Sequence, residues 1–192
     1  MKIYLDFDGT LFNTDKFYQD YLNLFQEYGL DEDLINNIKL ELFKTTKFNL
    51  DILTNYLVKK YNLDNNILLK VNNLYNSSYV FKDVIPFLEK YKNLEINLLT
   101  YGEYNYQLKK IDGSNLKKYF KDIIITDKDK SKLNLDYQNN LFIDNNPTEI
   151  KKFLEVTKNV IRIRREEDKY SKLDSNSREY KSLLEIKLKN VL

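Results

Sequence analysis

The chain has 192 residues, a net charge of +2, and neither cysteine nor histidine. Its length allows one substantial core, and the near balance of 31 basic and 29 acidic residues gives no strong field for nucleic acid or a membrane surface. The absence of cysteine excludes thiol nucleophiles, thiolate metal sites and disulfides. Hydrolytic chemistry would therefore depend on carboxylates, hydroxyls, lysine and a metal held by oxygen ligands.

The first segment joins a short apolar strand to a pair of acids. Ile3 to Leu5 is apolar, and Asp6 and Asp8 follow it, with Gly9 after them. Residues i and i+2 of an extended chain point to the same side, so the two carboxylates project together from the carboxyl end of the strand. Open α/β sheets bind ligands at that end. Two acids this close repel each other unless a cation or a shared proton lies between them.

Residues 15–76 carry only helical patterns. Apolar residues recur there at spacings of three and four, which is the period of an amphipathic helix. The expected helices span residues 15–28, 31–43, 50–61 and 65–75. Four short amphipathic helices in a row favour a small bundle. We therefore expect an all-helical module inserted after the first strand.

From residue 79 the pattern changes to alternating strands and helices. Strands are expected at residues 95–100, 122–126, 141–144 and 159–163, the second of them buried. Helices are expected at residues 83–91, 103–111, 114–120 and 179–191, with a loop at 164–178. A further helix begins at Asn146 as N-cap, with Pro147 and Glu149 at its first and third positions. Repeated βα units predict a parallel sheet covered by helices on both faces.

Polar residues follow the strands of this expected sheet. They are Asp6 and Asp8, Thr100, the stretch 126–132, and Asp144 with Asn145. Because the carboxyl ends of parallel strands meet along one edge, these side chains should converge. Carboxylates, a hydroxyl, a lysine and an amide at one edge can bind Mg²⁺ and a phosphoryl group together.

Four motifs resemble, in this order, those of the haloacid dehalogenase-like (HAD) superfamily of phosphohydrolases. They are Asp6-Phe7-Asp8-Gly9-Thr10, Leu98-Leu99-Thr100-Tyr101-Gly102, Lys130, and Phe142-Ile143-Asp144-Asn145-Asn146-Pro147. The first is a full match to the family's D-x-D-G-T. The resemblance implies an α/β fold, with a Rossmann-like three-layer core, a parallel sheet in the strand order 3-2-1-4-5 and a small helical cap. Residues 1–12 and 81–192 would form the core, and residues 13–80 the cap.

The resemblance also implies a role for each motif residue. Asp6 would be the nucleophile that forms an aspartyl-phosphate, and Asp8 the general acid and base. Thr100 and Lys130 would hydrogen-bond the phosphoryl oxygens and balance their charge. The remaining implied roles are phosphate or substrate contacts at Gly9, Thr10, Tyr101 and Gly102, and metal ligands at Asp6, Asp8 (through its carbonyl), Asp144 and Asn145.

Three assignments in or near these motifs are less direct: the lysine of the third motif, Asn145 and Glu149. Lys128, Lys130 and Lys132 alternate along the third motif, and Lys130 is preferred over Lys132. Asn145 stands where many relatives carry a second acid, which should weaken Mg²⁺ binding without abolishing it, because an amide oxygen is an adequate ligand. Glu149 is interpreted as a helix-capping residue.

The resulting hypothesis is a cytoplasmic, Mg²⁺-dependent phosphatase that hydrolyses a small phosphomonoester. In the family that the motifs resemble, a second acid at the position of Asp8 distinguishes phosphatases and mutases from dehalogenases. A capped site favours small phosphorylated molecules, and neither a membrane nor a nucleic-acid partner is indicated. The alternatives are a phosphomutase or nucleic-acid-end phosphatase of the same fold, or a catalytically weak relative that binds or regulates.

Overall fold

A computed structural model describes residues 1–166 and 178–188, and it contains a six-stranded sheet in the order β3-β2-β1-β4-β5-β6. Every neighbouring pair in this sheet is parallel. The strands are β1 Lys2–Leu5, β2 Glu95–Tyr101, β3 Ile123–Thr126, β4 Leu141–Asp144, β5 Val160–Ile163 and β6 Arg178–Tyr180. The expected order 3-2-1-4-5 is confirmed, and β6 extends the sheet beyond β5.

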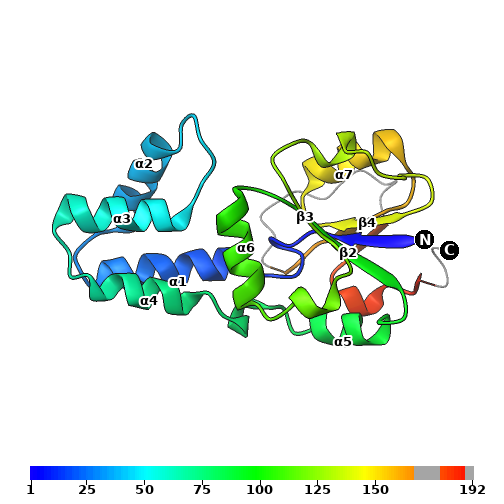
Figure 1. Cartoon of the computed structure of the whole chain (residues 1–192), viewed down its shortest axis with the longest axis horizontal. Coiled ribbons are helices and arrows are strands. Elements are labelled where there is room, and N and C mark those ends of the chain that lie inside the picture. Colours follow the sequence, from blue (N-terminus) through cyan, green and yellow to red (C-terminus); the bar gives the residue numbers. More distant parts are fainter. Residues whose placement is uncertain (167–177, 189–192) are drawn as a thin grey trace.

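Helices cover both faces of the sheet, which gives the expected three-layer α/β architecture. Figure 1 shows α7 on one side of the sheet and α5 on the other. The helices of this part are α5 Val84–Lys90, α6 Tyr104–Gly113 and α7 Pro147–Val156, with 3₁₀ turns η2 Lys117–Tyr119, η3 Lys130–Lys132 and η4 Leu183–Glu185. The side chain of Asn146 caps α7 by accepting from the Thr148 amide, and Pro147 is its first residue, as the sequence predicts.

The helices between β1 and β2 form what we call the helical module. They are α1 Thr14–Gln26, α2 Glu32–Leu42, α3 Leu50–Tyr61 and α4 Asn66–Leu74, followed by the 3₁₀ turn η1 Ser77–Tyr79. Figure 1 shows them at one end of the molecule, beyond α6. The chain enters and leaves the module side by side, because the Asn13 amide donates to the Tyr79 carbonyl and the Phe81 amide to the Leu11 carbonyl. A division of the chain at residues 13 and 80 stays a prediction.

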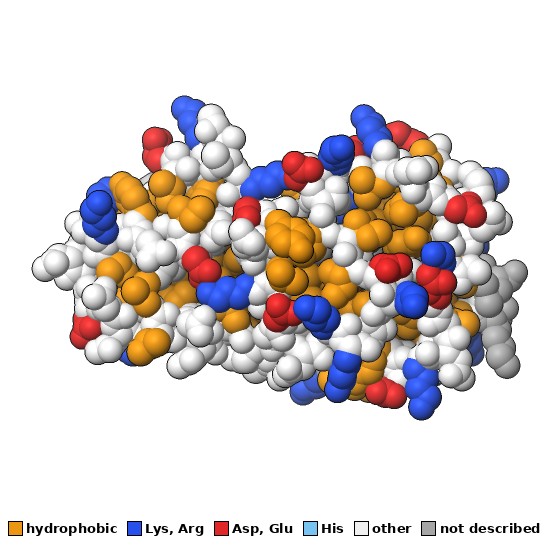
Figure 2. Space-filling model, viewed as in Figure 1, with side chains coloured by type: hydrophobic (Ala, Val, Ile, Leu, Met, Phe, Trp, Pro, Cys, Tyr) orange, Lys and Arg blue, Asp and Glu red, His pale blue; other side chains and the backbone are white. Residues whose placement is uncertain are grey.

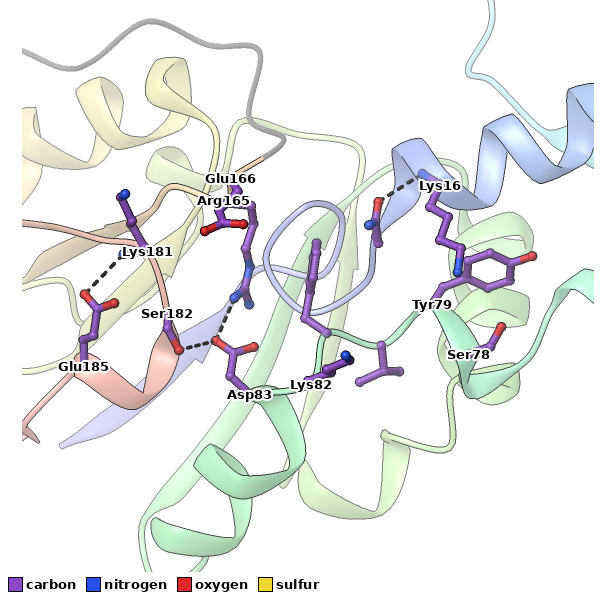
Figure 3. A pocket seen from close by; sticks show the side chains of 13 residues that line it. Lys16, Ser78, Tyr79, Lys82, Asp83, Arg165, Glu166, Lys181, Ser182 and Glu185 are labelled. Carbon is purple, nitrogen blue, oxygen red and sulfur yellow. Dashed lines mark hydrogen bonds and ion pairs between the residues drawn. The ribbon is translucent and has the colours of Figure 1, made fainter.

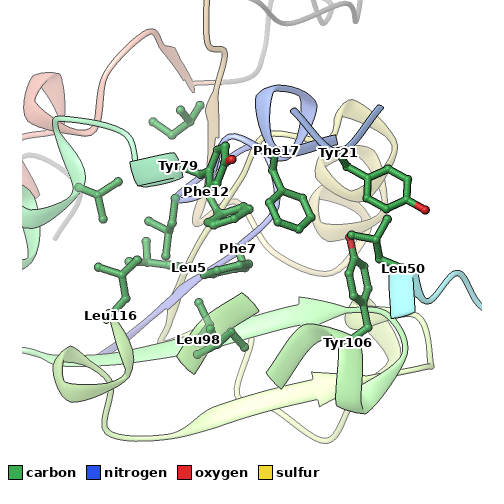
Figure 4. Close-up of a cluster of buried hydrophobic side chains, with 14 of the residues drawn as sticks. Leu5, Phe7, Phe12, Phe17, Tyr21, Leu50, Tyr79, Leu98, Tyr106 and Leu116 are labelled. Atoms are coloured by element: carbon green, nitrogen blue, oxygen red, sulfur yellow. The ribbon is translucent and has the colours of Figure 1, made fainter. Parts of the chain in front are cut away.

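One continuous apolar cluster runs from the sheet into the helical module. Ile3 and Leu5 of β1 belong to it together with Tyr21 of α1. Phe12 and Phe17 lie between the two parts in Figure 4, with their ring centroids 5.5 Å apart. The opposite face of the sheet carries a smaller cluster covered by α7. The module is therefore packed onto the core rather than tethered to it.

Two expectations for the strands and turns need correction. Residues 114–120 form no α-helix, only the 3₁₀ turn η2, and the Ser114 hydroxyl donates to the Ile111 carbonyl at the end of α6. Ile123 to Ile125 are half-buried rather than buried, because β3 is the edge strand of the sheet.

The expected terminal helix at residues 179–191 is wrong for the described residues. Residues 178–180 instead add β6 to the sheet, and residues 183–185 form η4. Leu183 and Leu188 are buried as their apolar character suggests, but Leu184 is half exposed. The apolar pattern indicates the burial of Leu183 and Leu188, but it does not reveal that an edge of the sheet is available for pairing. Most of the expected loop, residues 167–177, lies outside the described residues.

The surface matches the charge balance of the sequence. Figure 2 shows basic and acidic side chains scattered over one face, without a gathering of either sign. Among the described residues, no helix combines the length and apolar character that crossing a membrane requires.

Candidate active site

Most of the motif residues meet at a cavity of about 210 Å³ at the carboxyl ends of β1, β2 and β4. Its lining consists of Asp6, Asp8, Thr100, Tyr101, Lys130, Asp144, Asn145, Asn146 and Glu149. These residues lie far apart in the sequence, and the parallel register of the three central strands brings them together. The edge predicted to bind a ligand thus contains a concave site.

Lys130 forms ion pairs with two acids of the cavity lining. Its ammonium donates to Asp6 Oδ1 at 2.5 Å and to Asp144 Oδ2 at 2.8 Å, and the side chains of all three residues are at most 8% exposed. Lys128 and Lys132 are exposed. Lys130 is thus the lysine of the alternating set that enters the site, because η3 turns the chain there and Tyr137 donates to the Lys130 carbonyl.

The environment of Asp6 raises the pKa of its carboxyl group strongly. Burial raises the pKa of Asp6 to about 7, aided by the Asp144 carboxylate and opposed by Lys130. Burial lowers the pKa of Lys130, but Asp144 and Asp6 outweigh it and hold that pKa above its ordinary value. A carboxyl group perturbed by desolvation and by specific charges in a cleft is typical of a functional site.

Asp8 is held by three donors that the sequence analysis did not identify. Lys110 and Thr14 donate to its Oδ1, each at 2.5 Å, and Gln107 donates to its Oδ2 at 2.8 Å. Burial raises the pKa of Asp8, but Lys110 in particular holds it below the ordinary value. Gln107 and Lys110 are three residues apart on α6, which places them on one face, but nothing in the sequence indicates that this polar face is buried.

Thr100 places a hydroxyl without a hydrogen-bond partner in the lining of the cavity. Its side chain is 1% exposed, and its Oγ1 is a buried atom without a hydrogen-bond partner. Buried polar groups are rarely left unpaired, so an unpaired hydroxyl in the lining of a cavity indicates a ligand oxygen. Tyr101 follows it at the end of β2 and is half exposed.

The other residues expected to contact substrate lie beside the cavity rather than in its lining. Gly9 has a positive φ of 75°, and a Cβ there would collide with the Asn145 side chain. Thr10 is fully buried, and its Oγ1 donates weakly to Asn145 Oδ1 at 3.4 Å. Gly102 approaches Gln107, where a Cβ would lie 2.5 Å from Nε2. Gly9, Thr10 and Gly102 thus lie in close contact with Asn145 or Gln107, and their contact with substrate stays a prediction.

The donor set fits a hard divalent cation. Asp6 and Asp144 supply carboxylate oxygens and Asn145 an amide oxygen, which are the ligands Mg²⁺ prefers. The lining carries four carboxyl groups and one lysine, so a cation would reduce an excess of negative charge. Within residues 1–166 and 178–188 no three acidic side chains form a metal site by themselves, and Lys130 lies between two of the acids. A metal would thus also require Asn145 and the Asp8 carbonyl.

Glu149 belongs to this site as well. The N-cap hydrogen bond of α7 is made by Asn146 and not by Glu149. The Glu149 side chain lines the cavity, and its carboxylate accepts from Lys152 at 2.7 Å. Its interpretation as a capping residue therefore misses its position. The signal for that position is the helix start itself, because the first turn of a helix that follows β4 must lie near the carboxyl ends of the strands.

A search with models of protein families and a search of curated proteins both found no match for this chain. Solved structures do match over its full length. A candidate haloacid dehalogenase-like hydrolase of Burkholderia xenovorans has 16% identity and a TM-score of 0.69, with 100% of this chain and 98% of that chain covered. A candidate beta-phosphoglucomutase of Thermotoga maritima has 17% identity and a TM-score of 0.64, with 100% and 99% covered.

A candidate HAD-hydrolase of Bacillus subtilis, determined with bound magnesium, has 18% identity and a TM-score of 0.62, with 96% of this chain and 95% of that chain covered. At these identities the likeness establishes the fold and leaves the reaction to be argued from the site. The coverage includes both the sheet and the helical module. The chain has the fold of the haloacid dehalogenase-like superfamily.

Proposed function

We propose that the protein is a Mg²⁺-dependent phosphatase that hydrolyses a small phosphomonoester through an aspartyl-phosphate on Asp6. The observation that carries this proposal is the buried Asp6–Lys130–Asp144 arrangement beside the unpaired Thr100 hydroxyl. A nucleophilic carboxylate, a cation for phosphoryl oxygens and an unused donor meet in one cavity of about 210 Å³. The size of this cavity favours a small phosphorylated molecule.

The residues divide the reaction into two steps. A carboxylate oxygen of Asp6 attacks phosphorus, and the bond to the leaving alcohol oxygen breaks as the new P–O bond forms. Asp8 protonates the alcohol in this step, and it must bind that proton beforehand, because Lys110 holds its pKa below the ordinary value in the free protein. In the second step Asp8 takes a proton from a water molecule, which attacks the aspartyl-phosphate, releases phosphate and restores the Asp6 carboxylate. Thr100 and Lys130 hydrogen-bond the phosphoryl oxygens throughout.

The metal would be held by Asp6, Asp144, Asn145 and the Asp8 carbonyl. When bound, Mg²⁺ supplies positive charge that offsets the repulsion between the phosphoryl group and the carboxylates. The helical module of residues 13–80 acts as a cap on the core of residues 1–12 and 81–192. It limits the access of water and bulky substrates, because it is bonded to the core beside the cavity. Thr14 donates to Asp8, and Asn49, in the loop before α3, donates to Glu103.

A phosphomutase is the second candidate, supported by the full-length likeness to the candidate beta-phosphoglucomutase of Thermotoga maritima. A mutase returns the phosphoryl group from Asp6 to a second hydroxyl of a sugar phosphate, whereas a phosphatase transfers it to water. Product analysis separates the two, because only the phosphatase releases inorganic phosphate in proportion to substrate consumed.

Purified protein with Mg²⁺ should release phosphate from p-nitrophenyl phosphate and from members of a panel of metabolite phosphates. Asp6→Asn should abolish the release while circular dichroism remains unchanged, because the amide is not a nucleophile. Absence of release from the whole panel would refute the phosphatase, and an active Asp6→Asn protein would refute the assigned nucleophile.

Trapping with BeF₃⁻ tests the metal and the aspartyl-phosphate together. BeF₃⁻ forms an adduct on a carboxylate that resembles the aspartyl-phosphate, so it should raise the melting temperature of the wild type only when Mg²⁺ is present. Asp6→Asn should show no such rise. Equal stabilisation without Mg²⁺ would contradict the metal requirement.

A further inference from the structure

Lys47 is a shielded cation without a hydrogen-bond partner. It lies in the loop between α2 and α3, and its Nζ is buried and donates no hydrogen bond to any of the described residues. Nζ forms an ion pair with Asp127 Oδ2 at 3.8 Å, which is longer than a hydrogen bond, and the Asp127 side chain is 71% exposed. An ammonium that is shielded from water but not hydrogen-bonded is costly, so its position needs an explanation.

The loop that carries Lys47 reaches toward the candidate active site. Figure 1 shows the α2–α3 loop on the side of the helical module that faces α6 and the sheet. The Lys47 ammonium lies over the Tyr101 ring, 4.6 Å from its centroid, and Tyr101 lines the cavity. Tyr101 also pairs with Thr126, which directly precedes Asp127. Lys47 is therefore placed at the carboxyl-end edge, on the β2–β3 side of the cavity.

Two other details hold this loop in place. Asn49, the N-cap residue of α3, donates to Glu103 Oε2 at 2.8 Å, and Glu103 is the N-cap residue of α6. Phe48 packs its ring edge-on against Tyr106, with centroids 5.4 Å apart. The neighbours of Lys47 in sequence are thus fixed to the core, which keeps the ammonium beside the cavity.

The lysines that pair with acids of the cavity lining all make close ion pairs, and Lys152 is bonded to Glu149. Lys130 is bonded to Asp6 and Asp144, and Lys110 is bonded to Asp8. Tyr101 lines the cavity and is half exposed, so a substrate that extends from the cavity on this side would approach the ammonium of Lys47. An anionic oxygen there would supply the charge-assisted hydrogen bond that Lys47 lacks.

We propose that Lys47 binds a second anionic group of the substrate, a carboxylate or a second phosphate, and so selects phosphomonoesters that carry such a group over neutral alkyl phosphates. This inference rests on the proposed phosphatase and names its substrate class. Lys47 is a specificity residue in it and takes no part in the transfer of the phosphoryl group.

Three substrates of one chain length test the proposal, namely 3-(phosphonooxy)propanoate, propane-1,3-diyl bisphosphate and propyl phosphate. The wild type should show a higher kcat/KM for at least one of the first two than for propyl phosphate. The specificity ratio is kcat/KM for the anionic compound divided by kcat/KM for propyl phosphate. Lys47→Met should reduce this ratio about 10- to 100-fold, the loss that follows removal of one hydrogen bond to a charged group. Lys47→Arg should retain most of the ratio, because it keeps the charge.

Two variants serve as matched controls. Lys44→Met removes an exposed lysine from the same loop and should leave the ratio unchanged. Asp127→Asn removes the acid that faces Lys47 and should raise the ratio, because the substrate anion then has no competitor. An unchanged ratio in Lys47→Met, or an equal loss in Lys44→Met, would overturn the proposal.

Binding separates this inference from the proposed reaction. Calorimetric titration of the Asp6→Asn protein with the same three compounds requires no turnover. Stronger binding of the carboxylate or bisphosphate compound, lost in the Asp6→Asn, Lys47→Met double variant, supports the role of Lys47 even if no phosphatase activity is found. Equal binding of all three compounds overturns that role, whatever the activity of the wild type.

Discussion

Lys130 is the residue on which the charge balance of the site depends. Its ammonium joins Asp6, at the end of β1, to Asp144, at the end of β4, and all three side chains are buried. Charges removed from water must be compensated by close partners of opposite sign. Without Lys130, two buried carboxylates would face each other with no cation between them.

Lys130→Met should therefore abolish phosphatase activity and lower the free energy of unfolding by about 3–5 kcal/mol, the loss measured when one partner of a buried ion pair is removed. Lys132→Met is the matched control. That lysine is exposed two residues further on, so its loss should change the unfolding free energy by less than about 0.5 kcal/mol. Urea denaturation and phosphate release measure both effects. Equal effects of the two variants would contradict the assignment of Lys130.

Asp83 connects the start of α5 to two later segments, one after β5 and one at the start of η4. It immediately precedes α5, and its Oδ2 accepts from Arg165 after β5 at 2.7 Å. The same oxygen accepts from the Ser182 hydroxyl and the Leu183 amide at the start of η4. Figure 3 shows Arg165, Asp83 and Ser182 converging at the wall of a second cavity of about 640 Å³. Arg165 also donates to the Thr10 carbonyl, and this hydrogen bond supports the turn at Gly9 and Thr10 that follows Asp8.

The stability contributed by Asp83 should depend on pH. Burial raises the pKa of Asp83, but Arg165 together with the Leu183 and Ser182 donors outweighs it and holds that pKa below its ordinary value. A depressed pKa means that the stabilisation is complete above the unfolded value of about 3.9 and is lost as the pH falls through the lower folded value.

Asp83→Asn should thus lower the free energy of unfolding by about 1–3 kcal/mol at pH 7, and the difference from wild type should shrink below about pH 4. Urea denaturation at a series of pH values measures it. A difference that stays constant down to pH 3 would show that Asp83 acts through its shape and not through its charge.

For the whole molecule, the shared apolar cluster determines how the helical module and the sheet unfold. Ile3 of β1 and Leu57 of α3 belong to the same cluster of buried side chains, linked through the aromatic rings around Phe12. Neither part can expose its side of this cluster to water without a large free-energy cost. The two parts should therefore behave as one cooperative unit.

Urea unfolding should accordingly show one transition with the same midpoint by far-UV circular dichroism and by tyrosine fluorescence. Tyrosine is a suitable probe because the chain has 16 of these residues and no tryptophan. The far-UV signal reports on the helices of the module and of the core together. Two separated midpoints would instead show that the module and the sheet are independent domains.

Local sequence was sufficient to predict most of the elements and the first motif. The spacing of apolar residues predicts α1 to α4 and the central strands because each pattern reflects one face turned to a core. The strand-end acids Asp6, Asp8 and Asp144 could be identified because parallel strands must bring their carboxyl ends to one edge. The order of the five predicted strands followed from the family that these motifs resemble.

Which polar side chains become buried, and which partners they find, depends on how the whole chain folds. The tertiary structure selected Lys130 from three alternating lysines, and it placed Lys110 and Gln107 on Asp8. It also put Glu149 in the lining of the cavity and turned residues 178–180 into a strand. Periodicity reports burial of apolar groups, whereas the burial of a charge depends on a partner that lies far away in the sequence.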